Sequence, residues 1–164
     1  MALSAMLKAC LSKAKIKYKS HKHPVAYTAQ EIAAAQHVPG KQLVKCVLVH
    51  TDTGYVLAVL QAIHLVDLAK LKKLLKAKTL TLAKESEIKK TFPDLEIGAM
   101  PPFGNFYGVP VIADKALTAA EEIVCNAGTH TETIKLRYRD FEQLVKPRIG
   151  VFGLHISKAR KSKR

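Results

Sequence analysis

The sequence predicts a mixed α/β fold: a single domain in which one curved, mixed β-sheet is surrounded by helices. The 164 residues fit one domain, and 48% of them are hydrophobic, enough for a sizeable core. Short apolar runs with strand character alternate irregularly with segments whose apolar residues recur every three or four positions. Elements that interleave in this way pack as layers around a sheet.

The N-terminal part begins with an amphipathic helix, expected over residues 2–16, with lysines on its polar face. A short extended segment follows near Lys17–His21. Thr28-Ala29-Gln30-Glu31 has the pattern of a capping box, so a second helix is expected from there to about His37. Pro39-Gly40 ends that helix.

The middle of the chain predicts a β-hairpin and two helices. Residues 43–49 and 55–60 are strands joined at the turn Asp52-Thr53-Gly54, and both are apolar enough to be central. Asp67 can cap a helix that runs to about Lys76. The side chains expected to point inward from this helix are Leu68, Leu71, Leu74 and Leu75. A short strand over residues 79–82 and a helix over 84–91 follow.

The C-terminal part predicts strands over residues 109–112, 122–125 and 133–137, and a helix over 138–145 that Pro147 ends. We assign residues 1–150 to the folded domain. Residues 151–164 are expected to form a basic, disordered tail, since their last eight positions are rich in lysine and arginine.

The charge of the chain favours a polyanionic partner. Lysine and arginine total 27 against 13 acidic residues, a formal net charge of +14. Basic residues gather in Lys13–Lys19, Lys70–Lys78 and Lys158–Arg164. A solvated surface explains any single cluster, but the three together favour contact with a nucleic-acid backbone. The absence of tryptophan and the excess of lysine over arginine argue against base reading or extensive stacking.

Several protein classes are disfavoured by composition. The sequence has no apolar run of 18 residues and no secretion signal, so a cytoplasmic protein without membrane contact is expected. Its three cysteines are far apart and lack a Cys-x-x-Cys pair, which suggests neither a disulfide framework nor a thiolate metal site. We expect no cofactor.

Three segments are candidates for chemistry. The loop Gly98–Gly104 holds two prolines between glycines, so it can present backbone N–H groups to a ligand at little entropic cost, although such a loop is also an ordinary tight connection. Lys45 stands in an otherwise apolar strand, where an ammonium needs an anion or must reach water at the rim. Gly128-Thr129-His130 follows a strand, where glycine allows a turn that aims the next side chains at a cleft. His21 and His23 could share a strand face, but no carboxylate completes a metal site.

These segments together resemble the YbaK and prolyl-tRNA synthetase-associated editing family. The resemblance covers about residues 15–145 and rests on Thr28–Ala33, Val38-Pro39-Gly40, Lys45, Gly98–Gly104 and Gly128-Thr129-His130, in the family's order and spacing. Proteins of this family are freestanding or synthetase-fused hydrolases that deacylate mischarged tRNA and so maintain translation fidelity. The resemblance implies the same mixed α/β fold, an aminoacyl-tRNA deacylase activity, binding of the tRNA acceptor end through backbone contacts, and an aminoacyl-tRNA synthetase as a possible partner.

The resemblance also implies site residues. Lys45 matches the strand lysine that contacts the terminal nucleotide, and Gly98 and Pro102 match the Gly-x-x-x-Pro loop that cradles the aminoacyl group. His130 matches the histidine beside the pocket, completing the implied catalytic set. The implied substrate-binding set is His23, Thr28, Met100, Pro101, Phe103, Gly104, Gly128 and Thr129.

Two alternatives from other classes remain. The chain lacks the Gly-x-Ser-x-Gly and His-Glu-x-x-His signatures of serine and zinc hydrolases. A cysteine-dependent hydrolase would use Cys46 or Cys125 with His130, but Cys46 follows Lys45 in a strand and should point to the opposite face. A non-catalytic tRNA-binding or synthetase-associated module would need only the basic segments.

Overall fold

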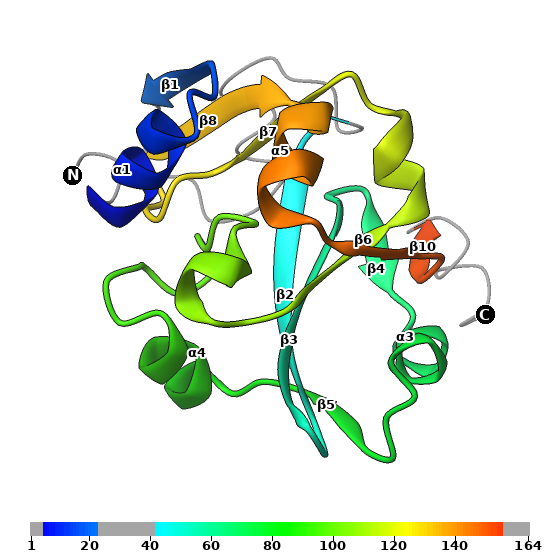
Figure 1. Ribbon diagram of the computed structural model, residues 1–164. Helices are drawn as coiled ribbons and strands as arrows, with labels where there is room; N and C mark the ends of the chain where they lie inside the picture. Colours follow the sequence, from blue (N-terminus) through cyan, green and yellow to red (C-terminus); the bar gives the residue numbers. More distant parts are fainter. Residues whose placement is uncertain (1–4, 23–41, 156–164) are drawn as a thin grey trace.

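A computed structural model describes residues 5–22 and 42–155 of the chain (Figure 1). The predicted mixed α/β single domain is confirmed. The strands are β1 (Tyr18–Lys22), β2 (Val44–Thr51), β3 (Gly54–Gln61), β4 (His64–Val66), β5 (Leu80–Leu82), β6 (Val111–Asp114), β7 (Glu122–Asn126), β8 (Glu132–Arg137), β9 (Arg148–Gly150) and β10 (Gly153–His155). The helices are α1 (Ala5–Lys13), α3 (Leu68–Leu75), α4 (Glu85–Thr91) and α5 (Tyr138–Val145), with short 3₁₀ turns η1 (Gly104–Tyr107) and η2 (Lys115–Ala119).

Within the described residues the strands form three hydrogen-bonded sheets, where the sequence predicted one curved sheet. Their orders are β5-β2-β3-β6-β9, β1-β8-β7 and β10-β4. The β2–β3 hairpin lies at the centre of the largest sheet, as predicted, and closes with Thr51 opposite Gly54. Gly54 adopts φ +134° there, a conformation that side chains rarely allow. The parallel partners β3 and β6 make this sheet mixed.

The largest sheet separates two cores. Leu57, Val59 and Val111 lie in the first core, which also contains buried residues of α1, α5, β7 and β8. Ala58 and Leu60 alternate with them and face the second core, where α3 packs. Figure 1 shows α3 and α4 flanking the lower part of the β2–β3 hairpin, with α1 and α5 near β8. The strand alternation thus assigns each side chain near the site to a definite face.

Helix α3 begins and ends as its sequence predicts, with one exception in its packing. The Asp67 side chain accepts a hydrogen bond from the Lys70 backbone N–H at 3.1 Å, and Lys76 takes a left-handed conformation after the last turn. Leu71 is fully buried, and Leu74 and Leu75 pack against the second core. Leu68 was predicted to point inward but is 38% exposed. As the first helical residue, it covers the turn before the helix, outside the packed stripe.

The other predicted elements are found with shifted ends, and several short ones were missed. Helix α1 ends at Lys13, before the predicted end at residue 16, because Lys15 adopts φ +56° after its last turn. Strands β4, β9 and β10 were not predicted. The folded chain also continues past the predicted boundary at residue 150, since Phe152 is fully buried and β10 pairs with β4. The predicted helix over 28–37 and residues 156–164 of the predicted tail lie outside the described residues.

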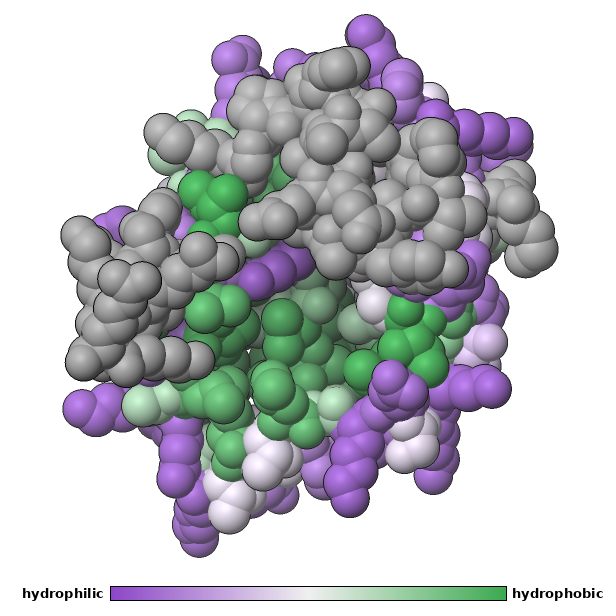
Figure 2. All heavy atoms as spheres, turned by 180° about the vertical axis from the view of Figure 1, so that it is seen from behind, coloured by the Kyte–Doolittle hydropathy of each residue, from purple (hydrophilic) through white to green (hydrophobic). Residues whose placement is uncertain are grey.

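Polar and apolar side chains are segregated on the surface. Figure 2 shows one face with a hollow lined mainly by hydrophobic residues, and hydrophilic residues at the outer edges of the described part of that face. In the described part of the chain, no helix has the length and apolar character needed to cross a membrane.

Candidate functional site

The loop Gly98–Gly104 is anchored at one end and accessible at the other. Met100 and Phe103 are buried in the first core, and Pro101 and Pro102 are buried as well. Gly104 packs so closely that a Cβ there would lie 2.9 Å from the Val109 carbonyl oxygen. Gly98, by contrast, is exposed and adopts φ +87°. The stiff loop that the sequence predicted is therefore fixed by the core and offers its N-terminal end to solvent.

The turn Gly128-Thr129-His130 is hydrogen-bonded directly to this loop. The Gly128 N–H donates to the Ala99 carbonyl at 3.0 Å, and the Glu96 N–H donates to the Gly128 carbonyl at 2.8 Å. Gly128 adopts φ +102°, and a Cβ there would lie 2.8 Å from Leu95. The backbone conformation thus favours glycine, and a side chain at this position would also require the end of Leu95 to move. Two segments far apart in the sequence form one backbone unit, which we call the loop–turn unit (residues 96–104 and 128–130).

His130 makes the third connection within the loop–turn unit. Its Nε2 lies 2.8 Å from the Ile97 carbonyl oxygen, and because a carbonyl only accepts, Nε2 carries the proton of this hydrogen bond. The Glu96 carboxylate lies 3.9 Å from the same nitrogen. A Cβ on Gly98 would lie 3.4 Å from the His130 ring. His130 therefore holds the backbone on the N-terminal side of Gly98 in place.

Lys45 lies on β2, half-buried, and its surroundings are mainly apolar. Desolvation lowers the pKa of its ammonium from the ordinary value of 10.5. Its register partner on β3 is Leu60. Within residues 5–22 and 42–155, the structure records no acidic side chain bound to Lys45. This is the state expected of a cation that meets its anion in a bound ligand, and also of a lysine that reaches the rim of the sheet.

A single parallel pairing joins the strand of Lys45 to the strand that leads into the turn. Leu43 pairs with Val124, and the Val124 N–H donates to the Gln42 carbonyl at 2.9 Å. Continuing this register places Lys45 at the level of Asn126, two residues before Gly128. The described residues show no side-chain hydrogen bond or ion pair between Lys45 and the loop–turn unit. The structure thus brings Gly98, Gly128 and His130 together and places Lys45 on the strand beside them.

Asn126 is a candidate that the sequence reasoning missed. Its side-chain oxygen is buried, and among the described residues no hydrogen-bond partner for that oxygen is found. An unsatisfied buried acceptor is costly unless a ligand satisfies it. Asparagine is also unfavourable in strands, and this mismatch two residues before a turn glycine was the available sequence signal.

The two cysteines of the alternative hydrolase are poorly suited to nucleophilic attack. Cys46 packs against the first core and Cys125 is fully buried within it. Burial raises the pKa of both thiols, which disfavours the reactive thiolate. Val47 packs against the second core, whereas Cys46 packs against the first. Because side chains alternate along a strand, Lys45 points to the same side of β2 as Val47 and away from Cys46, as predicted.

Two predicted substrate-binding residues, His23 and Thr28, lie outside the described residues. His21, which the sequence analysis considered together with His23 for a metal site, is exposed on β1. In the described part of the chain, no group of three or more His, Cys, Asp or Glu residues is arranged to hold a metal ion. Thr129 is buried, and its hydroxyl lies 3.2 Å from that of Thr131.

The fold has solved representatives. A structure described as that of a proposed trans-editing enzyme for prolyl tRNA synthetase is 22% identical, with a TM-score of 0.82 over 93% of this chain and 99% of that one. At this identity the likeness establishes the fold.

Sequence comparison then gives the family. A family model for the aminoacyl-tRNA editing domain matches residues 23–144, and the chain belongs to that family. Over 104 residues, 63% of the chain, it is 31% identical to a proline–tRNA ligase of Geobacillus sp. (strain WCH70) and to another of Geobacillus kaustophilus (strain HTA426). The matched region covers 18% of each ligase, so the chain spans a small part of the length of these relatives.

Proposed function

We propose that this protein hydrolyses the ester bond of mischarged aminoacyl-tRNA, removing a small amino acid from a tRNA such as the proline tRNA. The observation that carries the proposal is the loop–turn unit: in a chain of the editing family, Gly98 is accessible while hydrogen bonds to Gly128 and His130 fix the backbone around it. The matched proline–tRNA ligases support the choice of tRNA.

The proposed chemistry needs no protein nucleophile. A water molecule attacks the ester carbonyl carbon, the bond to the ribose oxygen breaks, and that oxygen takes up a proton as the amino acid leaves. Backbone N–H groups near Gly98 would stabilise the negative charge that develops on the carbonyl oxygen. The ribose hydroxyl of the substrate can help to orient the water.

Each site residue has a distinct proposed role. Lys45 contacts the terminal nucleotide as a cation whose partial desolvation strengthens its attraction for phosphate. His130 is a positioning residue, since its Nε2 proton is committed to the Ile97 carbonyl. The buried Met100, Pro101, Pro102, Phe103 and Gly104 support the loop.

Single-turnover hydrolysis of a panel of mischarged tRNAs tests this function. We expect release of one or a few small amino acids at a rate well above that of the free aminoacyl-tRNA, and no release from correctly charged tRNA. No release across the panel would reject the deacylase. tRNA binding measured on the same preparation would then decide for the second candidate, a non-catalytic tRNA-binding or synthetase-associated module, which the net charge of +14 favours. With either function a cytoplasmic location is expected, since tRNA is charged and used there.

A further inference from the structure

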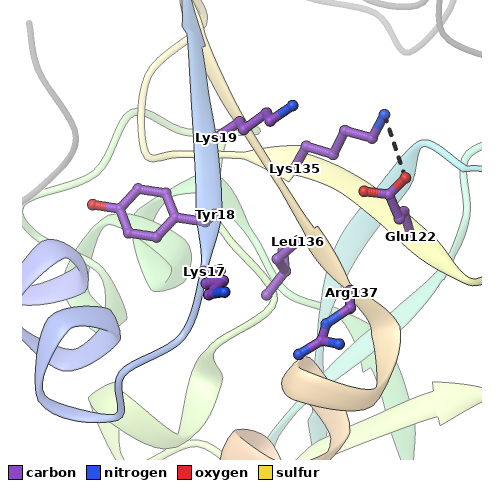
Figure 3. Close-up of a pocket in the computed structure, with 7 residues that line it drawn as sticks. All are labelled: Lys17, Tyr18, Lys19, Glu122, Lys135, Leu136 and Arg137. Atoms are coloured by element: carbon purple, nitrogen blue, oxygen red, sulfur yellow. Dashed lines mark ion pairs between the residues drawn. The ribbon is translucent and has the colours of Figure 1, made fainter.

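The outer face of the β1-β8-β7 sheet carries four cations around one shallow hollow. The hollow has a volume of about 330 Å³ and is lined by residues of all three strands and by Lys17, which directly precedes β1. Figure 3 shows Lys19 and Lys135 on neighbouring strands extending to the same side, with the Arg137 guanidinium turned toward the side of Lys17. We call Lys17, Lys19, Lys135 and Arg137 the basic groove.

Strand register explains why these side chains gather. Lys19 is the direct partner of Lys135 across β1 and β8, so the two side chains share a face. Arg137 lies two residues beyond Lys135 and therefore points the same way. The intervening Leu136 is buried in the first core. Like charges directly opposite each other are destabilising, so the arrangement favours an anion from outside the chain.

Acidic side chains compensate only part of this charge. Glu122 lies 3.6 Å from the Lys135 ammonium, and Asp140 lies 3.1 Å from the Arg137 side chain. Lys17 and Lys19 are both exposed, and the described residues show no ion pair for either. Two cations of the groove are therefore available to an anion, and the other two reinforce the local positive potential.

We propose that the basic groove binds the phosphate backbone of tRNA away from the esterified end. The proposal rests on the proposed function for the identity of the RNA. Strand β8 begins two residues after His130, and Lys135 lies five residues after it, about 16 Å along an extended chain. This span is longer than one nucleotide, so a phosphate bound in the groove would belong to a nucleotide further along the tRNA than the esterified one. The same sheet thus carries the loop–turn unit at one end and the groove further along.

Binding of uncharged tRNA tests the groove without relying on hydrolysis. The variant Lys17→Gln/Lys19→Gln removes two exposed cations and leaves both ion pairs intact. We expect its affinity to fall about tenfold near 0.1 M salt, and the slope of log K against log[salt] to decrease in magnitude by about one to two. The single-turnover rate at saturating charged tRNA should stay unchanged, because neither residue belongs to the proposed site.

The matched control is Lys89→Gln/Lys90→Gln, which removes the same charge from exposed positions on α4, outside the three basic clusters of the sequence. Its affinity and salt slope should remain close to those of the wild type, and thermal melts check that both variants are folded. Equal losses in the two variants would overturn the proposal, since net charge alone would explain them. Unchanged affinity in the Lys17/Lys19 variant would overturn it as well, and an acidic protein would become the occupant to consider. If the Lys17/Lys19 variant lost tRNA affinity as expected but the protein hydrolysed no charged tRNA, the proposed deacylase activity would be rejected and the proposed tRNA-binding groove would stand.

Discussion

A side chain added at Gly98 would contact the His130 ring, and its effect on the proposed site can be separated from backbone strain. Gly98 and Gly108 have similar left-handed conformations, φ +87° and φ +73°. A Cβ would approach the His130 ring to 3.4 Å at Gly98, and nothing within 4 Å at Gly108. Alanine at either position should cost about 1–2 kcal/mol of folding free energy because of the backbone.

Only Gly98→Ala is expected to impair deacylation, by about tenfold or more, since the added methyl group occupies the accessible end of the loop. Urea unfolding and single-turnover hydrolysis of both variants provide the comparison. Equal deacylation rates in the Gly98→Ala and Gly108→Ala variants would mean that the substrate does not bind at Gly98.

Lys45 offers the sharpest residue-level test, because the structural and functional interpretations predict different results. Lys45→Met removes a partly desolvated ammonium and keeps the length of the side chain, so stability should be held or raised at pH 7. Deacylation should fall by at least about two orders of magnitude if the cation contacts the terminal nucleotide. Single-turnover rates beside thermal melts measure both effects. A folded variant with the wild-type rate would remove Lys45 from the site.

The pH dependence of stability gives an independent check on Lys45. Its folded-state pKa lies below the ordinary 10.5, so the charged side chain opposes folding at neutral pH. That cost diminishes as pH rises through the lowered pKa and is gone above 10.5. The stability advantage of Lys45→Met should accordingly shrink between pH 7 and the alkaline range. Chemical denaturation of both proteins across this range would show it, and a gap independent of pH would contradict the desolvation.

Glu87 connects helix α4 to the β2–β3 hairpin. Its carboxylate accepts a hydrogen bond from the Tyr55 hydroxyl at 2.7 Å and lies 3.5 Å from His50. The Tyr55 hydrogen bond is the main cause that lowers the pKa of Glu87. A carboxyl with a lowered folded-state pKa contributes stability above its ordinary pKa and loses it as pH falls through the folded value.

Glu87→Gln should therefore destabilise the protein at pH 7 and have less effect under acidic conditions. The matched control Glu85→Gln changes another carboxylate in the first turn of α4. Denaturation curves from pH 3 to pH 7 test the difference between the two variants. If the loss of stability in both variants depended on pH in the same way, its cause would be the charge in the first turn of α4 and not the hydrogen bond between Tyr55 and Glu87.

Elements with local signals could be predicted from sequence, and those that depend on distant partners could not. The cap at Asp67 and the turn before Gly54 are encoded by neighbouring residues, and both were found where expected. Strands β4 and β10 have three residues each, too few to show a period, and they exist because they pair with each other. For the proposed site, sequence motifs predicted Gly98 and His130. The hydrogen bond of His130 to the Ile97 carbonyl and the unsatisfied Asn126 oxygen depend on the folded arrangement and could not be predicted from sequence.

For the molecule as a whole, the net charge of +14 predicts a steep dependence of tRNA affinity on salt. Backbone contacts release counterions, so log K should fall linearly with log[salt] and lose roughly tenfold or more between 50 and 200 mM. Titration of fluorescently labelled tRNA at several salt concentrations measures this directly. A flat response would mean that contacts other than phosphate dominate binding.

The single pairing of Leu43 with Val124 has a consequence for the order of folding. The β2–β3 hairpin closes over a short loop, whereas this pairing must bring together segments far apart in the chain, which costs more chain entropy and is slower. The hairpin can therefore form before the strand of Lys45 meets the end of β7. In a refolding experiment, circular dichroism from the strands should recover ahead of the proposed deacylation, because the proposed site is complete only after the slowest contact has formed.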